Sequence, residues 1–216
     1  MAETYLVSVN AGNVELEGDL VIPSRARGLV LFAHGSGSSR HSPRNRYVAR
    51  VLHDAGIGTL LIDLLTLDEE RIDAYTMHLR FDIPLLAKRL VGALMWLSDH
   101  HPKLGIGLFG ASTGAAAALV AAARLPQIVR AIVSRGGRPD LAGAAFLHSV
   151  MAPTLLIVGG EDSDVIALNE QALELMKNAK EKKLVIVPGA THLFEEPGKL
   201  EEVSSLACVW FSEHIA

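Results

Sequence analysis

The stretch from residue 105 to residue 119, GIGLFGASTGAAAAL, constrains the fold more than any other part of the chain. Its apolar run at 106–109 predicts a short buried strand. The alanine-rich run after Thr113 predicts a helix, because alanine has the highest helix propensity. Between them, residues 110–114 match G-x-S-x-G, a pattern in which a sharp strand-to-helix turn exposes the serine hydroxyl above a sheet. The sequence therefore predicts a tight turn centred on Ser112.

The two glycines of this turn, Gly110 and Gly114, follow from its geometry. The backbone on either side of Ser112 approaches so closely that a Cβ at either glycine would clash. The helix that begins at the serine places positive dipole near it, and the Thr113 N–H points toward the same region. A small-residue turn without function is the alternative interpretation, so partners further along the chain must decide between the two.

A second motif overlaps the first, because residues 105–110 also satisfy the dinucleotide fingerprint G-x-G-x-x-G. That fingerprint requires a strand before its first glycine, whereas residues 98–103 (SDHHPK) indicate the end of a helix and a turn. The acidic residue expected about twenty positions later is also missing. Nucleotide binding at this site is therefore rejected, and no cofactor is expected.

Length and composition indicate one α/β domain spanning residues 1–216, half of them hydrophobic. The net charge of −4 does not favour nucleic acid or an anionic membrane as a partner. The segment 1–4 lacks the basic and apolar regions of a signal peptide, and the one cysteine excludes an internal disulfide. These features predict a soluble cytoplasmic protein. They leave its oligomeric state open, as a monomer or a homodimer.

Strands and helices are predicted to alternate along the chain, after an N-terminal antiparallel hairpin formed by residues 4–9 and 14–22. Buried strands are expected at 28–33, 57–64, 106–109, 128–133, 154–158 and 184–187, and helices at 42–55, 81–99, after 113, 140–149, 164–179 and 200–215. This alternation implies a mostly parallel sheet with helices on both faces. Such sheets bind ligands at the carboxyl ends of their strands, where residues 34–36, Ser112, Arg135, Asp162 and His192 all fall.

A serine hydroxyl needs an adjacent base to act as a nucleophile, and that base is usually a histidine held by a carboxylate. After Ser112 the chain offers Asp162 and then His192, which follows a strand and a glycine-containing loop. Asp164 is the alternative acid, although it is better placed as the N-cap of the next helix. The other histidines fall on predicted helices or polar loops, where a solvated side chain is the default: His41, His53, His78, His100, His101, His148 and His214.

An oxyanion site needs two convergent donors. The Thr113 N–H is the first, and the loop at 34–36 is expected to give the second through the Ser36 N–H, with the Gly35 N–H as the alternative. A glycine-serine turn without function is the other interpretation of that loop. No metal is expected, because the chain has no H-x-x-x-H or C-x-x-C pair.

Two arginines near the same edge, Arg40 and Arg135, are candidates to bind a substrate carboxylate, although solvated surface arginines are an equally good interpretation. About twenty residues separate the strand at 128–133 from the next, too few for a separate lid. The connection at 65–80 is rich in charge, has no evident broad apolar face, and could border the site through Tyr75 or Met77. Small substrates are therefore expected.

The chain resembles the α/β-hydrolase superfamily over essentially its whole length, and within it the single-domain group similar to dienelactone hydrolases. The resemblance is carried by the runs HGSGSSRHSPRNRYVA, GASTGAAAALVAAARLP, VSRGGRPDLAG and PGATHLFEEPG. They are similar to bacterial members, some of which occur fused to a phosphoribosyltransferase-like domain that is not expected in these residues. The resemblance implies eight strands and a triad of Ser112, His192 and Asp162.

One departure from that group concerns its substrate. Dienelactone hydrolases proper use a cysteine at the position of Ser112, and a glutamate from the loop that here reads HGSGSS. The expected activity is therefore hydrolysis of small carboxylic esters, or of lactones, through an acyl-enzyme. The alternatives are a hydrolase-fold protein that binds a ligand or partner without catalysis, and an acyltransferase that uses the same triad.

Overall fold

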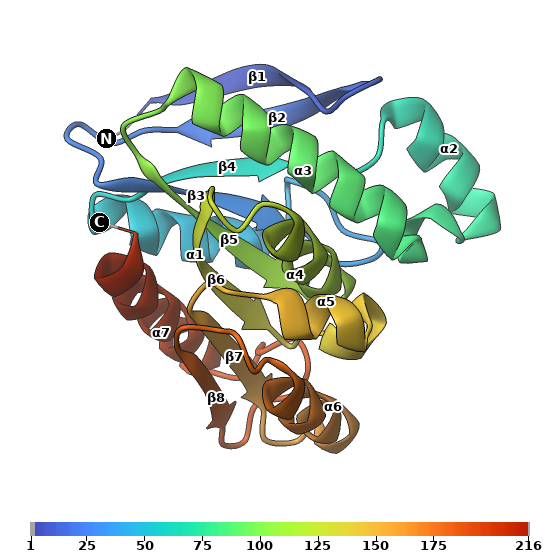
Figure 1. Ribbon diagram of the computed structural model, residues 1–216, viewed down its shortest axis with the longest axis vertical. Coiled ribbons are helices and arrows are strands. Elements are labelled where there is room, and N and C mark those ends of the chain that lie inside the picture. Colours follow the sequence, from blue (N-terminus) through green and yellow to red (C-terminus); the bar gives the residue numbers. More distant parts are fainter. Residues whose placement is uncertain (1–2, 216) are drawn as a thin grey trace.

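The computed structural model describes residues 3–215, and the prediction about a leader at Met1–Ala2 falls outside this range. These residues form one eight-stranded sheet in the order β1-β2-β4-β3-β5-β6-β7-β8 (Figure 1). β1 and β2 form an antiparallel hairpin, β2 also runs antiparallel to β4, and the remaining neighbours are parallel. The predicted fold class, with its N-terminal hairpin and mostly parallel sheet, is confirmed.

The central strands are buried on both faces, which explains why their sequences are continuously apolar rather than alternating. β3, β4 and β7 are buried along their whole length. The strands are β1 (Thr4–Asn10), β2 (Glu15–Val21), β3 (Gly28–Ala33), β4 (Gly58–Ile62), β5 (Gly105–Ala111), β6 (Val129–Arg135), β7 (Thr154–Gly159) and β8 (Lys182–Val187).

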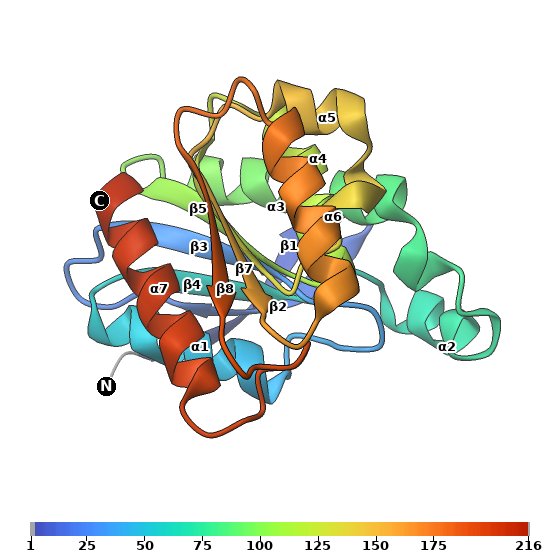
Figure 2. The same cartoon turned by 90° about the horizontal axis from the view of Figure 1, so that it is seen from below.

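Helices cover both faces of the sheet, as Figure 2 shows. One core cluster joins the sheet to α3, α4, α5 and α6, and a second joins its other face to α1 and α7. The helices are α1 (Pro43–Asp54), α2 (Leu67–Thr76), α3 (Ile83–His100), α4 (Thr113–Arg124), α5 (Ala144–Ser149), α6 (Ser163–Leu175) and α7 (Lys199–His214), with single turns at η1 (Leu79–Phe81) and η2 (Pro139–Ala142).

The start of α1 illustrates how the local sequence sets these elements. The Ser42 hydroxyl accepts a hydrogen bond from the Asn45 N–H at 3.3 Å, and Pro43 occupies the first helical position. A serine cap followed by proline is a favourable way to begin a helix, because the proline lacks an N–H that would otherwise be unpaired. α1 therefore begins close to the carboxyl ends of the strands, beside the loop that follows β3.

The helix α2 was not predicted. Residues 67–76 have almost no amphipathic pattern, so apolar spacing did not reveal the helix. Its capping box does explain it: the Thr66 hydroxyl accepts from the Glu69 N–H, and the Glu69 carboxylate accepts from the Thr66 N–H at 2.8 Å. The helix lies at the edge of the molecule, beyond the carboxyl end of β4 (Figure 1).

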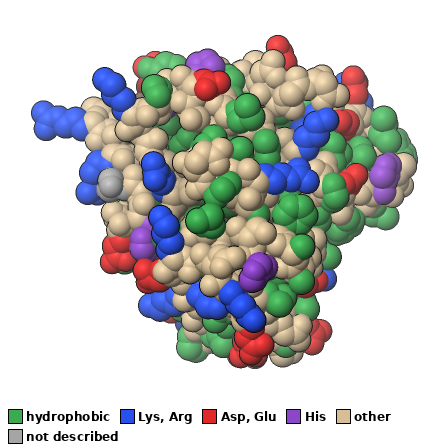
Figure 3. Space-filling model, in the orientation of Figure 1, with side chains coloured by type: hydrophobic (Ala, Val, Ile, Leu, Met, Phe, Trp, Pro, Cys, Tyr) green, Lys and Arg blue, Asp and Glu red, His purple; other side chains and the backbone are tan. Residues whose placement is uncertain are grey.

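Several hydrophobic side chains are exposed along residues 65–80, although α2 has almost no amphipathic pattern. Hydrophobic side chains gather over α2 at the right edge of Figure 3, and those exposed in this segment and just after it are Leu67, Ile72, Tyr75, Met77 and Phe81. Elsewhere on the same face, basic and acidic side chains are interspersed. Within residues 3–215, no helix has the length and apolar character needed to cross a membrane.

Candidate active site

Ser112 lies between β5 and α4 in a strained backbone conformation. Its φ of 50° and ψ of −120° are unusual for a residue with a Cβ. Such strain costs on the order of 1–3 kcal/mol and persists only where the surrounding structure fixes it. Here the Ser112 N–H donates to the Arg135 carbonyl at 3.2 Å, and the Ser112 carbonyl accepts from the Arg138 N–H at 3.1 Å. The end of β6 therefore holds the turn in place.

Both glycines of the turn are required by close packing. A Cβ at Gly110 would lie 2.9 Å from the Gly114 carbonyl oxygen and would clash with the Cα of Ala115. A Cβ at Gly114 would clash with the carbonyls of Ala33 and His34, at the end of β3. The predicted closeness of the two arms of the turn is thus observed. Gly114 therefore serves mainly to let the end of β3 and the loop that follows it approach the start of α4.

Asp162 and His192 meet at the same edge of the sheet. The His192 Nδ1 lies 2.6 Å from the Asp162 Oδ2, and the two side chains come from the loops that follow β7 and β8. The Asp162 side chain is 17% exposed and that of His192 is 38% exposed. A carboxylate in this position fixes the histidine as the tautomer with a proton on Nδ1, which leaves Nε2 free to accept a proton.

Asp164 occupies a different position from the one expected. α6 begins at Ser163, so Asp162 is the boundary residue and Asp164 lies inside the first turn rather than at the N-cap. The Asp162 side chain makes no capping bond, because it contacts His192 instead. Of the two carboxylates considered for the acid, the one that contacts His192 is therefore Asp162.

Gly136 links the histidine to the serine turn. It follows Arg135, whose carbonyl accepts the Ser112 N–H, and a Cβ at Gly136 would lie 3.5 Å from the His192 Nδ1. The φ of 51° at Gly136 also favours glycine. The Ser112 hydroxyl itself makes no hydrogen bond within residues 3–215. Such bonds are often long or poorly aligned until substrate binds.

The loop after β3 packs against the nucleophile turn. A Cβ at Gly35 would lie 3.1 Å from the Ser112 Cβ, so this loop passes directly beside the serine. The Ser36 N–H donates to the Thr113 Oγ1 at 2.9 Å, and Thr113 is buried. The two predicted oxyanion donors, Ser36 and Thr113, are thus adjacent in space. The Ser36 N–H is occupied by the threonine hydroxyl in this structure.

His34 anchors that loop, a role that the sequence does not predict. Its Nε2 accepts from the Leu64 N–H at 3.1 Å, and its Nδ1 lies 3.0 Å from the Gly35 carbonyl. Burial lowers the pKa of His34, so the ring is neutral and its Nδ1 carries the donated proton. The continuous apolar run before His34 places this residue at the end of a fully buried strand. That position is the one sequence feature that indicates a buried histidine.

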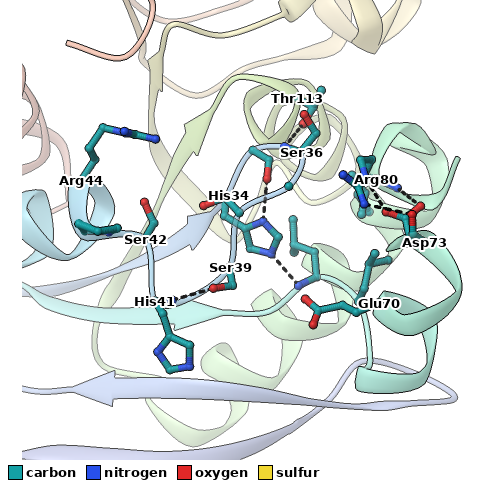
Figure 4. A pocket seen from close by; sticks show the side chains of 17 residues that line it. His34, Ser36, Ser39, His41, Ser42, Arg44, Glu70, Asp73, Arg80 and Thr113 are labelled. Carbon is teal, nitrogen blue, oxygen red and sulfur yellow. Dashed lines mark hydrogen bonds and ion pairs between the residues drawn. The ribbon is translucent and has the colours of Figure 1, made fainter. Parts of the chain in front are cut away.

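An open pocket of about 610 Å³ lies beside this loop (Figure 4). Residues 34–39 line one part of it together with Thr113, and the charged side chains of α2 and the adjoining turn line another part. Arg44 and Arg80 stand on opposite sides of the pocket in Figure 4. Tyr75 and Met77 do not line this pocket, and Tyr75 is 90% exposed, so α2 turns its charged side chains toward the pocket.

Arg40 is held in a structural ion cluster. Its guanidinium pairs with Asp63, with Glu17 at 2.6 Å and with Asp19 at 3.5 Å, and its backbone N–H also donates to Asp63 at 2.7 Å. Three carboxylates leave no free face for a substrate carboxylate. The expectation that Arg40 binds substrate is therefore not supported, and its role is to join β2, β4 and the loop before α1.

Arg135, unlike Arg40, has a guanidinium that no carboxylate of the described residues compensates. The side chain is buried, with 7% exposure, and its Nε and Nη1 have no hydrogen-bond partner among the described residues. Burial, together with the positive charge of Arg44, lowers the pKa of Arg135 to about 10. The guanidinium is therefore still charged at neutral pH, without a carboxylate to compensate it.

The glycines of the rejected dinucleotide pattern have a packing explanation. A Cβ at Gly107 would lie 2.7 Å from the Phe211 ring, and one at Gly105 would clash with the Ile215 carbonyl. Both glycines let α7 approach β5 closely. No group of three histidine, cysteine, aspartate or glutamate side chains within residues 3–215 is arranged to hold a metal ion.

An eight-stranded, mostly parallel sheet with a strained serine turn after its fifth strand and a histidine after its last is characteristic of the α/β-hydrolase fold. The model of the dienelactone hydrolase family matches residues 60–212, more than half of the chain, and the chain therefore belongs to that family. A dienelactone hydrolase structure from Anabaena variabilis is 61% identical, with a TM-score of 0.96, and covers 100% of this chain and 99% of its own. These similarities support a hydrolase.

Two further similar proteins bear on the length of the chain and on its fold. A putative phosphoribosyl transferase of Mycobacterium tuberculosis is 58% identical over 211 residues, which are 97% of this chain and 46% of the relative. The chain thus spans about half the length of the curated relatives it matches. An α/β serine hydrolase without a lid from Xanthomonas campestris is 20% identical, with a TM-score of 0.76, and covers 98% of this chain and 94% of its own. This last likeness shows the fold alone.

Proposed function

We propose that this protein hydrolyses small carboxylic esters through an acyl-enzyme formed on Ser112. The observation that carries the proposal is the 2.6 Å contact between Asp162 and His192, at the sheet edge that also holds the strained serine turn. A neutral histidine oriented by a carboxylate is what a serine hydroxyl requires to become a nucleophile at neutral pH.

The reaction follows from these positions. His192 Nε2 accepts the Ser112 proton as Oγ attacks the ester carbonyl, and Asp162 stabilises the imidazolium that forms. The tetrahedral intermediate collapses when His192 protonates the leaving alkoxide, which leaves an acyl-Ser112. Water then attacks the acyl carbonyl, with His192 first accepting its proton and afterwards returning one to Ser112. The products are the carboxylic acid and the alcohol.

The developing oxyanion is assigned to the backbone N–H groups of Thr113 and Ser36. The Thr113 N–H begins α4, where the helix dipole favours negative charge. The Ser36 N–H must exchange its bond to the Thr113 hydroxyl for one to the oxyanion, or share the proton between both acceptors. The threonine hydroxyl thus keeps this amide oriented toward the serine turn before substrate arrives. Gly35 is the alternative donor from the same loop.

A fluorophosphonate probe distinguishes this proposal from a binding protein without catalysis. Such probes phosphonylate a serine only when a neighbouring base activates it. We expect one probe per chain, attached to Ser112 and identified by mass spectrometry of the labelled peptide, and no label on the Ser112→Ala variant. A protein that stays unlabelled, or that is labelled equally well in the variant, contradicts the proposal.

The acyl chain is expected to be short, because most of the residues that line the pocket beside the serine turn are polar or charged (Figure 4). A longer chain would remove water from these groups without replacing their hydrogen bonds, which offsets the roughly 0.8 kcal/mol gained per buried methylene. Across p-nitrophenyl esters from acetate to palmitate, kcat/KM should be highest between acetate and butyrate. A maximum at decanoate or beyond would contradict this expectation.

A further inference from the structure

Asn169 is a fully buried polar side chain midway along α6, outside the triad. Its Nδ2 donates to the Gly137 carbonyl at 3.0 Å and to the Val165 carbonyl at 2.7 Å, so both protons of the amide are used. Its Oδ1 is buried without a partner among the described residues. An apolar side chain of the same size would avoid that unpaired oxygen, so packing alone does not explain an asparagine at this position.

The segment that receives the Asn169 bond, residues 135–138, holds the serine turn from two sides. The Arg135 carbonyl accepts the Ser112 N–H at 3.2 Å, and the Arg138 N–H donates to the Ser112 carbonyl at 3.1 Å. The Gly137 carbonyl lies between these two contacts in the chain. Any displacement of the 135–138 segment is therefore transmitted directly to the peptide groups on either side of the serine.

The same segment also packs against the histidine. A Cβ at Gly136 would lie 3.1 Å from the His192 carbonyl oxygen and 3.4 Å from the His192 Cε1, so the glycine backbone passes close to the imidazole. The Gly136 N–H donates to the Ile157 carbonyl of β7 at 2.8 Å. The 135–138 segment thus lies between the serine turn and His192, and its position affects both.

The helix that carries Asn169 begins at the triad acid. Asp162 is the boundary residue of α6, and its Oδ2 lies 2.6 Å from the His192 Nδ1. Asn169 is therefore a side-chain link between the element that begins at the acid and the segment that holds the nucleophile. Such a link is needed because the strained φ at Ser112 persists only where the surrounding structure fixes it.

We propose that Asn169 is a positioning residue, whose bond to the Gly137 carbonyl keeps the 135–138 segment in place so that Ser112 remains poised beside His192. The proposal rests on the proposed esterase function and identifies a contact that maintains its geometry. Without the bond, the Gly137 carbonyl loses its buried donor and the segment shifts. Asn169 does not line the pocket beside the serine turn, so its loss should slow the chemical step and leave binding unchanged.

The kinetic test uses Asn169→Leu, which keeps the volume of the side chain and removes both donated bonds. The rate of fluorophosphonate labelling measured against probe concentration separates the maximal rate, kinact, from the apparent affinity, KI. We expect kinact to fall by about 10- to 100-fold, because small displacements of a reacting group have effects of this size. KI should stay within about twofold, and kcat/KM for p-nitrophenyl acetate should fall in parallel with kinact.

Thr154→Val is the matched control for a lost buried hydrogen bond. The Thr154 hydroxyl is buried and donates to the Ala152 carbonyl at 2.9 Å, at the end of β7 opposite the site. Both variants should lower Tm by a few degrees, since each removes a buried donor to a backbone carbonyl. Thr154→Val should nevertheless keep the kinact of the wild type. Equal loss of kinact in both variants, or wild-type kinact in Asn169→Leu, would overturn the proposal.

Asn169→Ser isolates the bond to the 135–138 segment. A serine hydroxyl in a helix can donate to the carbonyl four residues earlier, here that of Val165, but it is one bond too short to reach Gly137. Its kinact should fall as in Asn169→Leu. This variant also carries the test if Asn169→Leu does not fold, and wild-type kinact in Asn169→Ser would assign the asparagine a role within α6 alone.

Amide hydrogen exchange, followed by NMR, tests the same contact without catalysis. The Ser112 and Arg138 amides should exchange at least about tenfold faster in Asn169→Leu than in Thr154→Val, because only the first variant frees the segment that holds them. Equal exchange in the two variants would overturn the proposal. The esterase proposal fails separately, when the wild type stays unlabelled by the probe. Labelled wild type with equally rapid labelling of both Asn169 variants leaves the esterase intact and removes the positioning role.

Discussion

Replacing Ser112 with alanine is expected to lower kcat for p-nitrophenyl acetate by about 10⁴-fold or more, because the members of a catalytic triad act as a unit. The alanine keeps the Cβ and therefore the backbone strain of the turn, whose φ is 50°. The free energy of unfolding should change by less than about 0.5 kcal/mol, as for other substitutions that remove no packed group. Steady-state kinetics and denaturant unfolding measure the two quantities separately.

Ser39→Ala is the matched control for this experiment. Ser39 also lines the pocket, but its hydroxyl accepts a hydrogen bond from the His41 N–H at 3.2 Å and lies on the loop rather than at the serine turn. Its turnover should stay within a few-fold of the wild type. Near-normal kcat in Ser112→Ala, or equal losses in both variants, would contradict the assignment of Ser112 as the nucleophile.

The serine turn was predictable because its requirements are local. Strand, turn and helix follow within fifteen residues, and the two glycines are fixed by contacts that any such turn makes. The mostly parallel sheet was predictable for a related reason: continuous apolar runs that alternate with helices admit few arrangements other than a parallel sheet. The contact between Asp162 and His192 follows, since both loops leave the same edge of that sheet.

Other features could not be read from the chain because they depend on distant partners. The sequence suggested Arg40 as a ligand for a substrate carboxylate, because its pairing with Glu17 and Asp63 arises only when β2 and β4 lie side by side. The helix α2 depends on a capping box rather than on apolar spacing, so the periodicity of residues 67–76 does not predict it. The sequence does not predict the role of His34, because its hydrogen bond with Leu64 joins the ends of two strands that are separate in the chain.

Replacing Asp162 with asparagine is expected to lower kcat by about 10³ to 10⁴-fold, while Asp164→Asn should change it only a few-fold. The Asp162 carboxylate accepts the His192 Nδ1 proton and stabilises the imidazolium. An asparagine amide placed there can donate to Nδ1, which favours the tautomer that carries its proton on Nε2. A histidine in that form cannot accept the proton of Ser112.

Asp164 is the matched control because it is the same residue type on the same helix end. It lies in the first turn of α6, where its charge interacts with the helix dipole, an effect of about 0.3–1 kcal/mol on stability. Asp164→Asn should therefore lower Tm slightly and leave the labelling rate with fluorophosphonate unchanged, whereas Asp162→Asn should slow that labelling in parallel with kcat. If both variants lose activity equally, or if Asp164→Asn loses more, then the acid of the triad is not Asp162 and the contact with His192 serves only to position the loop.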